Sequence, residues 1–316
     1  MFQLFKIRDF GSYISDSFTF LKVQGKNYFK NYLKFAFLPL VLLMASMSLI
    51  GTFYYRLIAT SLGDTSGETL NNSFVNNNAV LLVLGLIALV VVGLYLALVN
   101  YSYPVYYMQI LSKNSEQKPE LRSIRALFKA DFSRLLLFGF LSLIVFSLIG
   151  IIALIIAGIL MFVIIGFFLF LLIIPFFITW YSLTLYFYID KKQPFFEAFK
   201  HGFYTITNNF WNIVGASLCM LIIVQVLGTI VTMIPYFITV FGVIFGMQTE
   251  GPENFDPSNV SIIGIVVIII YCFSILVSTI LNHLLLIQNG LVYYSEREKL
   301  EYNTMHQSID DIGKYE

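Results

Sequence analysis

Hydrophobic residues run along this chain in long uncharged stretches separated by polar segments. The stretches cover residues 35–55, 69–112, 135–189, 201–249 and 257–295. About 20 apolar residues in a helix cross the hydrocarbon core of a bilayer, so each stretch can hold a span. At about 1.5 Å per helical residue, the third stretch is long enough for two spans. We expect it to turn back near Gly158.

This pattern predicts an all-α polytopic membrane protein with six transmembrane helices. The predicted spans are residues 35–58, 79–107, 135–157, 160–188, 211–235 and 260–290. Pro235 is expected to end or kink the fifth span, because proline lacks the amide hydrogen that a helix needs. The apolar piece from Phe237 to Met247 would then lie at the membrane surface or re-enter. We expect a single integral membrane domain over residues 1–316, in which residues 295–316 form a cytoplasmic tail.

Charged side chains sort by sign between the predicted spans. The chain has 19 Lys and Arg and 18 Asp and Glu, and only Arg56 lies inside a predicted span. The other basic residues lie before the first span, after the second and fourth spans, and in the tail, whereas the gaps after the first and fifth spans contain only acids. Cytoplasmic loops carry the excess of Lys and Arg. Both termini are therefore expected in the cytoplasm. Heavy use of Phe, Ile, Asn, Tyr and Lys favours a bacterial source and hence the inner membrane.

An amphipathic segment precedes each odd-numbered span. Its apolar positions recur at helical spacing: Phe18, Leu21, Gly25, Tyr28 and Tyr32; Leu121, Ile124, Phe128, Phe132 and Leu135; Phe196, Phe199, Phe203, Ile206 and Phe210. Basic residues flank the first two segments: Lys22, Lys26, Lys30 and Lys34; Arg122, Arg125 and Lys129. Basic amphipathic helices beside a span are typical of the membrane interface. We predict that these seven residues contact lipid headgroups, although the lysines could equally serve only to set topology.

The segments and spans together predict three parallel repeats, each an amphipathic interfacial helix followed by a helical hairpin. The repeats cover about 10–108, 119–189 and 194–294. Parallel repeats imply a pseudo-symmetry axis along the membrane normal. The even-numbered spans end alike, in Tyr101, Tyr106 and Tyr107, in Tyr181 and Tyr186, and in Tyr293 and Tyr294. Tyrosine at these positions is typical of an interfacial aromatic belt. The alternative is that any hairpin protein with basic inner loops would show the same pattern.

Few polar residues lie inside the spans. Asn100, Gln225, Asn282 and His283 are the candidates for intramembrane polar contacts. Hydrogen bonds between helices are the simplest role for them, with ligand contact, or proton handling by His283, as the alternative. The three histidines lack a zinc spacing, and the chain has no nucleophile elbow, Walker loop or dinucleotide turn. We therefore expect no enzyme activity, no metal and no cofactor.

The segment from Phe196-Glu197-Ala198-Phe199 through Asn208-Asn209-Phe210-Trp211, with its counterpart from Asp16 to Asn31, resembles a diffuse bacterial group of multi-span membrane proteins. The group includes the membrane domain found beside some glycerophosphoryl diester phosphodiesterases and related families of unknown function. The resemblance covers most of the chain and implies its architecture. No phosphodiesterase catalytic domain is present, so that activity does not carry over.

These features favour a non-enzymatic inner-membrane scaffold or accessory subunit of an envelope complex. Its expected partners are anionic lipid headgroups on the cytoplasmic side and membrane or cytoplasmic proteins, with no nucleic acid. The alternative is a transporter of lipid or a small apolar solute through a pseudo-threefold helical bundle. A groove lined by Asn100, Gln225 and Asn282 would favour the transporter.

Overall fold

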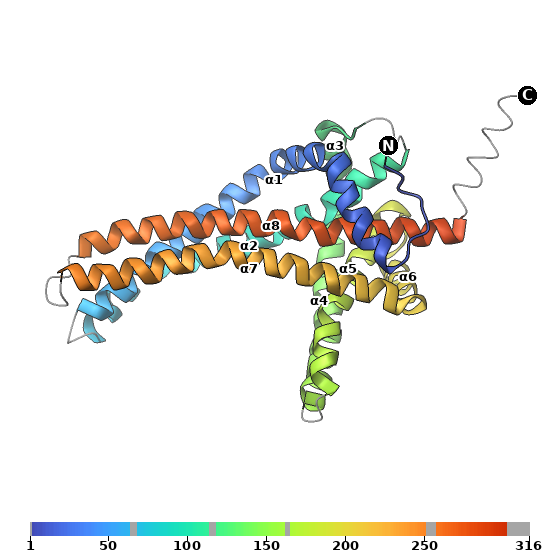
Figure 1. The fold of residues 1–316 in the computed structure, drawn as a ribbon. Helices are drawn as coiled ribbons and strands as arrows, with labels where there is room; N and C mark the ends of the chain where they lie inside the picture. Colours follow the sequence, from blue (N-terminus) through green and yellow to red (C-terminus); the bar gives the residue numbers. More distant parts are fainter. Residues whose placement is uncertain (1, 64–67, 114–117, 162–164, 251–256, 302–316) are drawn as a thin grey trace, which may run out of the picture. The chain divides into compact units, whose positions relative to one another are not determined.

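A computed structural model of the 316-residue chain describes residues 2–63, 68–113, 118–161, 165–250 and 257–301. These residues form helices joined by short connections (Figure 1). The helices are α1 (Phe10–Gly63), α2 (Glu68–Lys113), α3 (Leu121–Ala130), α4 (Phe132–Leu160), α5 (Ile165–Asp190), α6 (Phe195–Asn208), α7 (Phe210–Glu250) and α8 (Pro257–Glu301). The prediction of an all-α chain is confirmed for the residues that the structure describes.

Six helical segments are long and apolar enough to cross a membrane. They are Phe10–Gly51, Ala79–Lys113, Phe132–Leu160, Gly166–Asp190, Phe210–Ile238 and Ile269–Glu301. Each overlaps one predicted span, so the prediction of six such helices is confirmed. They indicate a multi-pass membrane protein.

The boundaries differ from the predicted ones in two places. α1 is one helix that joins the first amphipathic segment to the first span, whereas Asp131 separates α3 from α4 and Asn209 separates α6 from α7. Pro235 does not end the helix, because α7 continues to Glu250, so of the two expected effects only a kink stays a prediction. Proline is tolerated in membrane helices, where local adjustments and neighbouring groups satisfy the freed carbonyl. The predicted turn near Gly158 falls close to the end of α4 at Leu160.

The chain forms two compact units, each assembled from segments distant in sequence. Unit 1 contains Met1–Phe35, Leu98–Val224 and Asn282–Glu316, and unit 2 contains Ala36–Ala97 and Gln225–Leu281. α1, α2, α7 and α8 contribute to both units. The three-repeat arrangement and the single-domain organisation stay predictions.

Unit 2 consists of apolar helical segments. Leu49 of α1 packs against Gly85 of α2, where an added β-carbon would lie 3.0 Å from the Leu49 side chain. The Ser48 hydroxyl and the Cys272 thiol, 3.7 Å apart, join α1 to α8. Large side chains such as Val80 and Phe273 are 72% and 62% exposed. Large exposed apolar patches are uncommon on soluble monomers, so this surface fits lipid.

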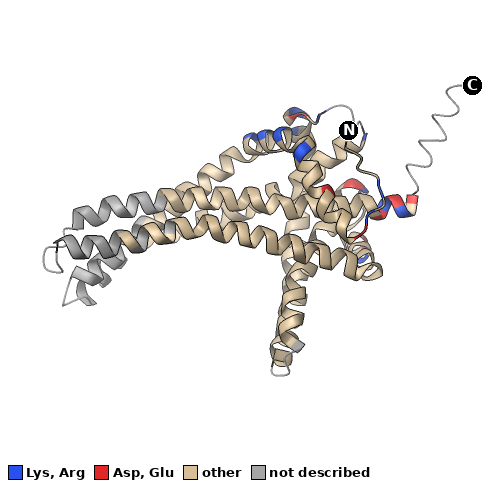
Figure 2. Cartoon of the chain, in the orientation of Figure 1, with Lys and Arg blue, Asp and Glu red and all other residues tan. Residues whose placement is uncertain are grey.

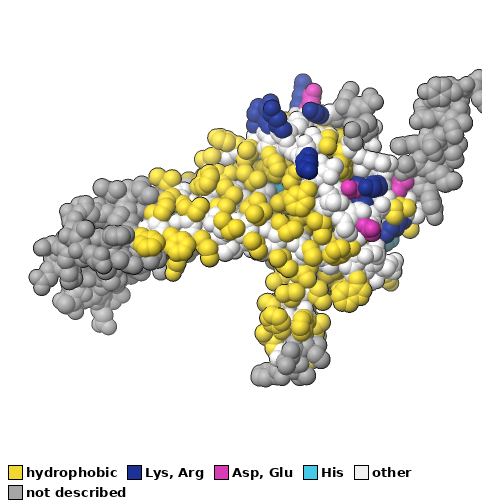
Figure 3. All heavy atoms as spheres, in the orientation of Figure 1, with side chains coloured by type: hydrophobic (Ala, Val, Ile, Leu, Met, Phe, Trp, Pro, Cys, Tyr) yellow, Lys and Arg dark blue, Asp and Glu magenta, His cyan; other side chains and the backbone are white. Residues whose placement is uncertain are grey.

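Unit 1 contains α3 to α6 and the adjoining parts of the other four helices. α4 and α5 form an antiparallel hairpin, and hydrophobic side chains cover the described part of the face that Figure 3 shows. α6 packs against α5 at Gly202, where a β-carbon would lie 2.9 Å from Oγ1 of Thr184. The indole Nε1 of Trp180 donates to the carbonyl of Phe199 at 2.9 Å. These contacts fix α6 beside the C-terminal half of α5.

Arg8 ties the N-terminal segment to the end of α8. Its side chain is buried, and Nε donates to Asp16 at 2.9 Å while the guanidinium also donates to the carbonyls of Gln3 and Leu4. The Arg8 backbone N–H donates to the Ser295 hydroxyl at 2.9 Å. Burial lowers the pKa of Arg8, and the Asp16 carboxylate opposes that shift. The N-terminal segment is therefore an ordered part of unit 1.

Candidate functional site

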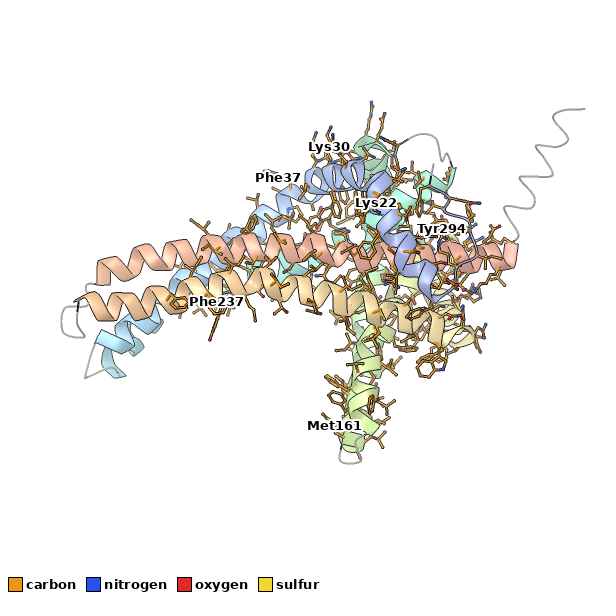
Figure 4. The ribbon with its side chains drawn as sticks, in the orientation of Figure 1. Lys22, Lys30, Phe37, Met161, Phe237 and Tyr294 are labelled. Carbon is orange, nitrogen blue, oxygen red and sulfur yellow. The ribbon has the colours of Figure 1, made fainter. Side chains whose placement is uncertain are left out.

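Four lysines form an exposed row on the N-terminal part of α1. Lys22, Lys26, Lys30 and Lys34 recur every four residues, and all four are exposed. Residues four apart share one side of a helix. Figure 2 shows these cations grouped along α1, and the side chains of Lys22 and Lys30 point outward in Figure 4.

α3 extends this row with three more cations. Arg122, Arg125 and Lys129 are exposed, while Ile124 and Phe128 on the opposite side of α3 are buried. Nη2 of Arg125 donates to the backbone carbonyl of Lys34 at 2.9 Å. We call the surface formed by these three residues and the four lysines the basic face.

Two asparagines of α1 hold the start of α3. The side-chain amides of Asn27 and Asn31 both donate to the carbonyl of Pro119, at 3.0 and 2.8 Å. Asn27 also donates to the Tyr107 hydroxyl at 3.1 Å. Bonds from two successive turns of α1 to one carbonyl fix the entry to α3. α1 and α3 are therefore joined in two places, by these bonds to Pro119 and by the bond from Arg125 to Lys34.

A buried cluster of tyrosines and one histidine lies behind the lysines. The Tyr28 hydroxyl hydrogen-bonds to Nδ1 of His283 at 2.8 Å, and the Tyr103 hydroxyl donates to the Tyr28 carbonyl at 2.6 Å. The Tyr107 hydroxyl donates to Gln24 at 3.2 Å. Buried polar groups cost free energy unless they are hydrogen-bonded. Here the bonds join α1 to α2 and α8, so the side of α1 opposite the basic face is fixed.

Of the four intramembrane polar candidates, Asn100 and His283 both contact Tyr32, whereas Asn282 and Gln225 do not share this cluster. Oδ1 of Asn100 accepts a hydrogen bond from the Tyr32 hydroxyl at 2.6 Å, which joins α2 to α1. His283 is fully buried, and its ring lies 4.0 Å from the Tyr32 ring, centroid to centroid. Asn282 and Gln225 are exposed, and Gln225 belongs to unit 2. A groove shared by Asn100, Gln225 and Asn282 stays a prediction.

Five of the seven tyrosines at the ends of the even-numbered spans are buried inside unit 1 and do not face lipid, while Tyr101 and Tyr181 are half-buried. Tyr106, Tyr107, Tyr186, Tyr293 and Tyr294 are at most 1% exposed. Several are bonded to polar side chains of unit 1, such as Tyr293, whose hydroxyl donates to Asp190 at 2.8 Å. An aromatic side chain with one polar tip suits a hydrogen-bonded core as well as an interface. The recurrence of tyrosine at helix ends was visible in the sequence, but it does not distinguish a hydrogen-bonded protein core from a membrane interface.

Arg297 forms a second polar centre near Tyr293 and the N-terminal segment. Its Nη1 donates to Asp190 at 2.8 Å, and its guanidinium lies 5.4 Å from the Phe5 ring centroid. The described residues contain no group of three or more His, Cys, Asp or Glu that could hold a metal ion. The largest group of exposed cations described above is the basic face: seven cationic side chains on two helices, able to donate hydrogen bonds to anionic groups.

No family model, curated protein or solved structure matches this chain. The resemblance to the diffuse bacterial group of multi-span proteins stays a prediction.

Proposed function

We propose that the chain is a non-enzymatic scaffold or accessory subunit of a membrane complex in a bacterial inner membrane, with both termini in the cytoplasm. In this role the basic face binds an acidic surface of a partner protein. Anionic headgroups are the expected contacts of those lysines that lie at the bilayer.

The observation that carries this proposal is the fixed position of the basic face. The seven cations are exposed, while the helices beneath them are held by the Asn27 and Asn31 bonds to Pro119 and by the bond from Tyr28 to His283. Association loses less conformational entropy when the binding surface is already ordered. Setting topology alone would need only the charges, not an ordered surface.

Electrostatics support the same role. The ion pairs of the described residues lie elsewhere, at Asp16, Asp131, Asp190, Glu296 and Glu301. In the part of the chain that is described, none of them uses a cation of the basic face. Among the described residues, the seven cations thus have no carboxylate partner. Complementary charge steers association and selects partners more than it sets raw affinity.

The direct test is purification of the tagged native protein in a mild detergent, followed by mass spectrometry of the proteins that remain bound. A second preparation carries Lys22→Gln, Lys26→Gln and Lys30→Gln together. We expect the parent to retain a protein partner at fixed stoichiometry and the triple variant to lose most of it. A matched control replaces Lys6, Lys191 and Lys200, which lie outside the basic face, with Gln and should keep the partner.

Two results would contradict the proposal. The parent could purify as a lone chain, which removes the scaffold role. Alternatively, the triple variant and the control could retain the same partner equally, which removes the basic face as its binding surface. Equal expression and equal melting of all three preparations in the detergent exclude misfolding as the cause of a loss.

A further inference from the structure

A pocket of about 520 Å³ lies in unit 1 between the first turns of α4 and the connection from α5 to α6. Two cations, Arg134 and Lys192, line it together with the Tyr188 ring and the apolar side chains of Leu137, Leu141 and Phe196. None of these residues belongs to the basic face. We call it the Arg134 pocket.

Arg134 is held in place by groups that use only part of its guanidinium. Nη2 donates to the carbonyls of Tyr188 and Gln193, at 2.8 and 2.7 Å. The guanidinium lies over the Tyr188 ring, 4.4 Å from its centroid. Nε is buried and has no hydrogen-bond partner among the described residues. The geometry therefore fixes the orientation of the cation and leaves part of its donor capacity unused.

Lys192 supplies the second cation from a constrained backbone. Its φ is 56°, in the left-handed region that side chains other than glycine adopt at a cost in free energy. Such residues persist where the surroundings determine them, and they cluster at functional sites. Here the two bonds from Arg134 pin the carbonyls on either side of Lys192. Nζ lies 2.6 Å from Asp131, while the Lys192 side chain remains 53% exposed.

The apolar lining begins directly beside these cations. Leu137 is 53% exposed and Phe196 is 66% exposed, and Leu141 is half-buried one turn further along α4. α4 is one of the six helices apolar enough to cross a membrane, and Arg134 lies in its first turn. The pocket thus has two cations at the edge of the span and apolar side chains along the span. This arrangement is complementary to a phospholipid, which has an anionic headgroup and apolar acyl chains.

We propose that the Arg134 pocket binds one anionic phospholipid. The phosphodiester accepts hydrogen bonds from Arg134 and Lys192, and the acyl chains lie along Leu137, Leu141 and Phe196. Two cations and the Asp131 carboxylate leave one net positive charge, which matches a lipid with a single phosphodiester charge, such as phosphatidylglycerol. A zwitterionic lipid adds a cation of its own and binds more weakly.

The test titrates the full-length protein in detergent with phosphatidylglycerol or phosphatidylcholine and counts bound lipids by native mass spectrometry. Lys192→Asn removes the charge and keeps a residue that tolerates the left-handed backbone. Its control, Lys191→Asn, changes the adjacent lysine, which pairs with Glu301 outside the pocket. We expect one phosphatidylglycerol to bind preferentially, about fivefold more weakly in Lys192→Asn and unchanged in Lys191→Asn.

A second variant, Phe196→Ala, tests the apolar wall and should also weaken phosphatidylglycerol binding. The same protein is also melted in the presence of inorganic phosphate. If the pocket were a site for a free anion, phosphate alone would raise the melting temperature of the protein. The proposal is overturned if Lys192→Asn binds phosphatidylglycerol as tightly as the parent, or if Phe196→Ala does. It is equally overturned if inorganic phosphate raises the melting temperature as much as the lipid at the same concentration.

Discussion

At the scale of single residues, unit 1 is organised by tyrosine side chains whose rings fill its interior and whose hydroxyls join its helices. Tyr28 illustrates both roles, because its ring lies 4.9 Å from the rings of Tyr103 and Tyr107 while its hydroxyl bonds to His283. Edge-to-face ring pairs add about 0.5–1.5 kcal/mol beyond their buried area. The hydrogen bonds then fix which faces of α1, α2 and α8 meet, since an unpaired buried hydroxyl would be costly.

Gly290 lets α8 pack closely against Met108 of α2 and Tyr186 of α5. A β-carbon at position 290 would collide with Sδ of Met108 and the hydroxyl of Tyr186, and both residues are fully or almost fully buried. Gly290→Ala should therefore destabilise unit 1 by about 1–3 kcal/mol, as overpacking does, despite the higher helix propensity of alanine. The measurement is the thermal melting midpoint of the detergent-solubilised protein, which should fall by several degrees.

The matched control is Gly150→Ala on α4, where nothing lies within 4 Å of an added β-carbon. This variant should melt at or slightly above the parent temperature. A Gly290→Ala protein that melts with the parent would show that α8 does not pack against α2 and α5 as described.

At the scale of elements, the helical type and the number of membrane-length segments were predicted from the sequence, but the buried side of α6 was not. On α6 the predicted apolar line included Phe196 and Phe203, yet these are 66% and 38% exposed. The buried side consists of Phe195, Ala198, Gly202 and Ile206. In lipid, large apolar side chains can face the hydrocarbon, whereas small residues let helices approach closely. Hydrophobicity therefore does not mark the protein-facing side as it does in water.

The joint between α1 and α3 could not be predicted, because it depends on a backbone carbonyl. Asn27 and Asn31 were visible in the sequence as part of the proposed repeat, but their common acceptor, Pro119, has no sequence signal. The basic residues of the face, by contrast, were predicted directly from their i, i+3 and i, i+4 spacing. Charge patterns identify a surface, and only the packed structure shows what holds it.

The bonds from Asn27 and Asn31 to Pro119 can be tested with the double variant Asn27→Ala, Asn31→Ala. Losing the two hydrogen bonds to the Pro119 carbonyl, of about 1 kcal/mol each, should ease local opening of α3 by about 2 kcal/mol. Backbone amides of α3 should then exchange with deuterium about thirtyfold faster, as measured by mass spectrometry. Asn212→Ala is the control, because Asn212 donates to Asn209 and not to α3. Unchanged exchange in the double variant would mean that the Pro119 contact does not hold α3.

At the scale of the whole molecule, six apolar helical segments indicate a multi-pass membrane protein, and most charged side chains of the described residues belong to unit 1. The six segments have mean hydropathy between 2.0 and 3.1, and the described parts of unit 2 contain almost entirely uncharged side chains. Unit 1 carries the basic face, the Arg8 and Arg297 centres and the Arg134 pocket. Partner binding and lipid binding are therefore both expected at unit 1.

If the basic face holds a partner by charge, the complex should weaken with salt. The screening length falls from about 10 Å at 0.1 M to about 3 Å at 1 M salt, so contacts between exposed charges weaken. We expect most of the partner to elute when the immobilised native complex is washed from 0.1 to 1 M NaCl. Retention at 1 M would assign the contact to an apolar surface instead. The ion pair between the buried Arg8 and Asp16 should be little affected by salt. The melting temperature of the protein should therefore be similar at 0.1 and 1 M NaCl.

The central claim is that the basic face lies on the cytoplasmic side of the membrane, where partners can reach it. It can be tested with single cysteines in a background that lacks Cys219 and Cys272, which are half-buried in α7 and α8. Cysteines at Ser66 and Asn254 probe the acidic gaps, and those at Ser115 and Gln193 probe the basic ones; of these four positions, only Gln193 lies within the described residues. The account predicts that an impermeant thiol reagent labels positions 66 and 254 on intact cells, and labels 115 and 193 only after lysis. Labelling of position 115 from outside would contradict the topology and the proposed function with it.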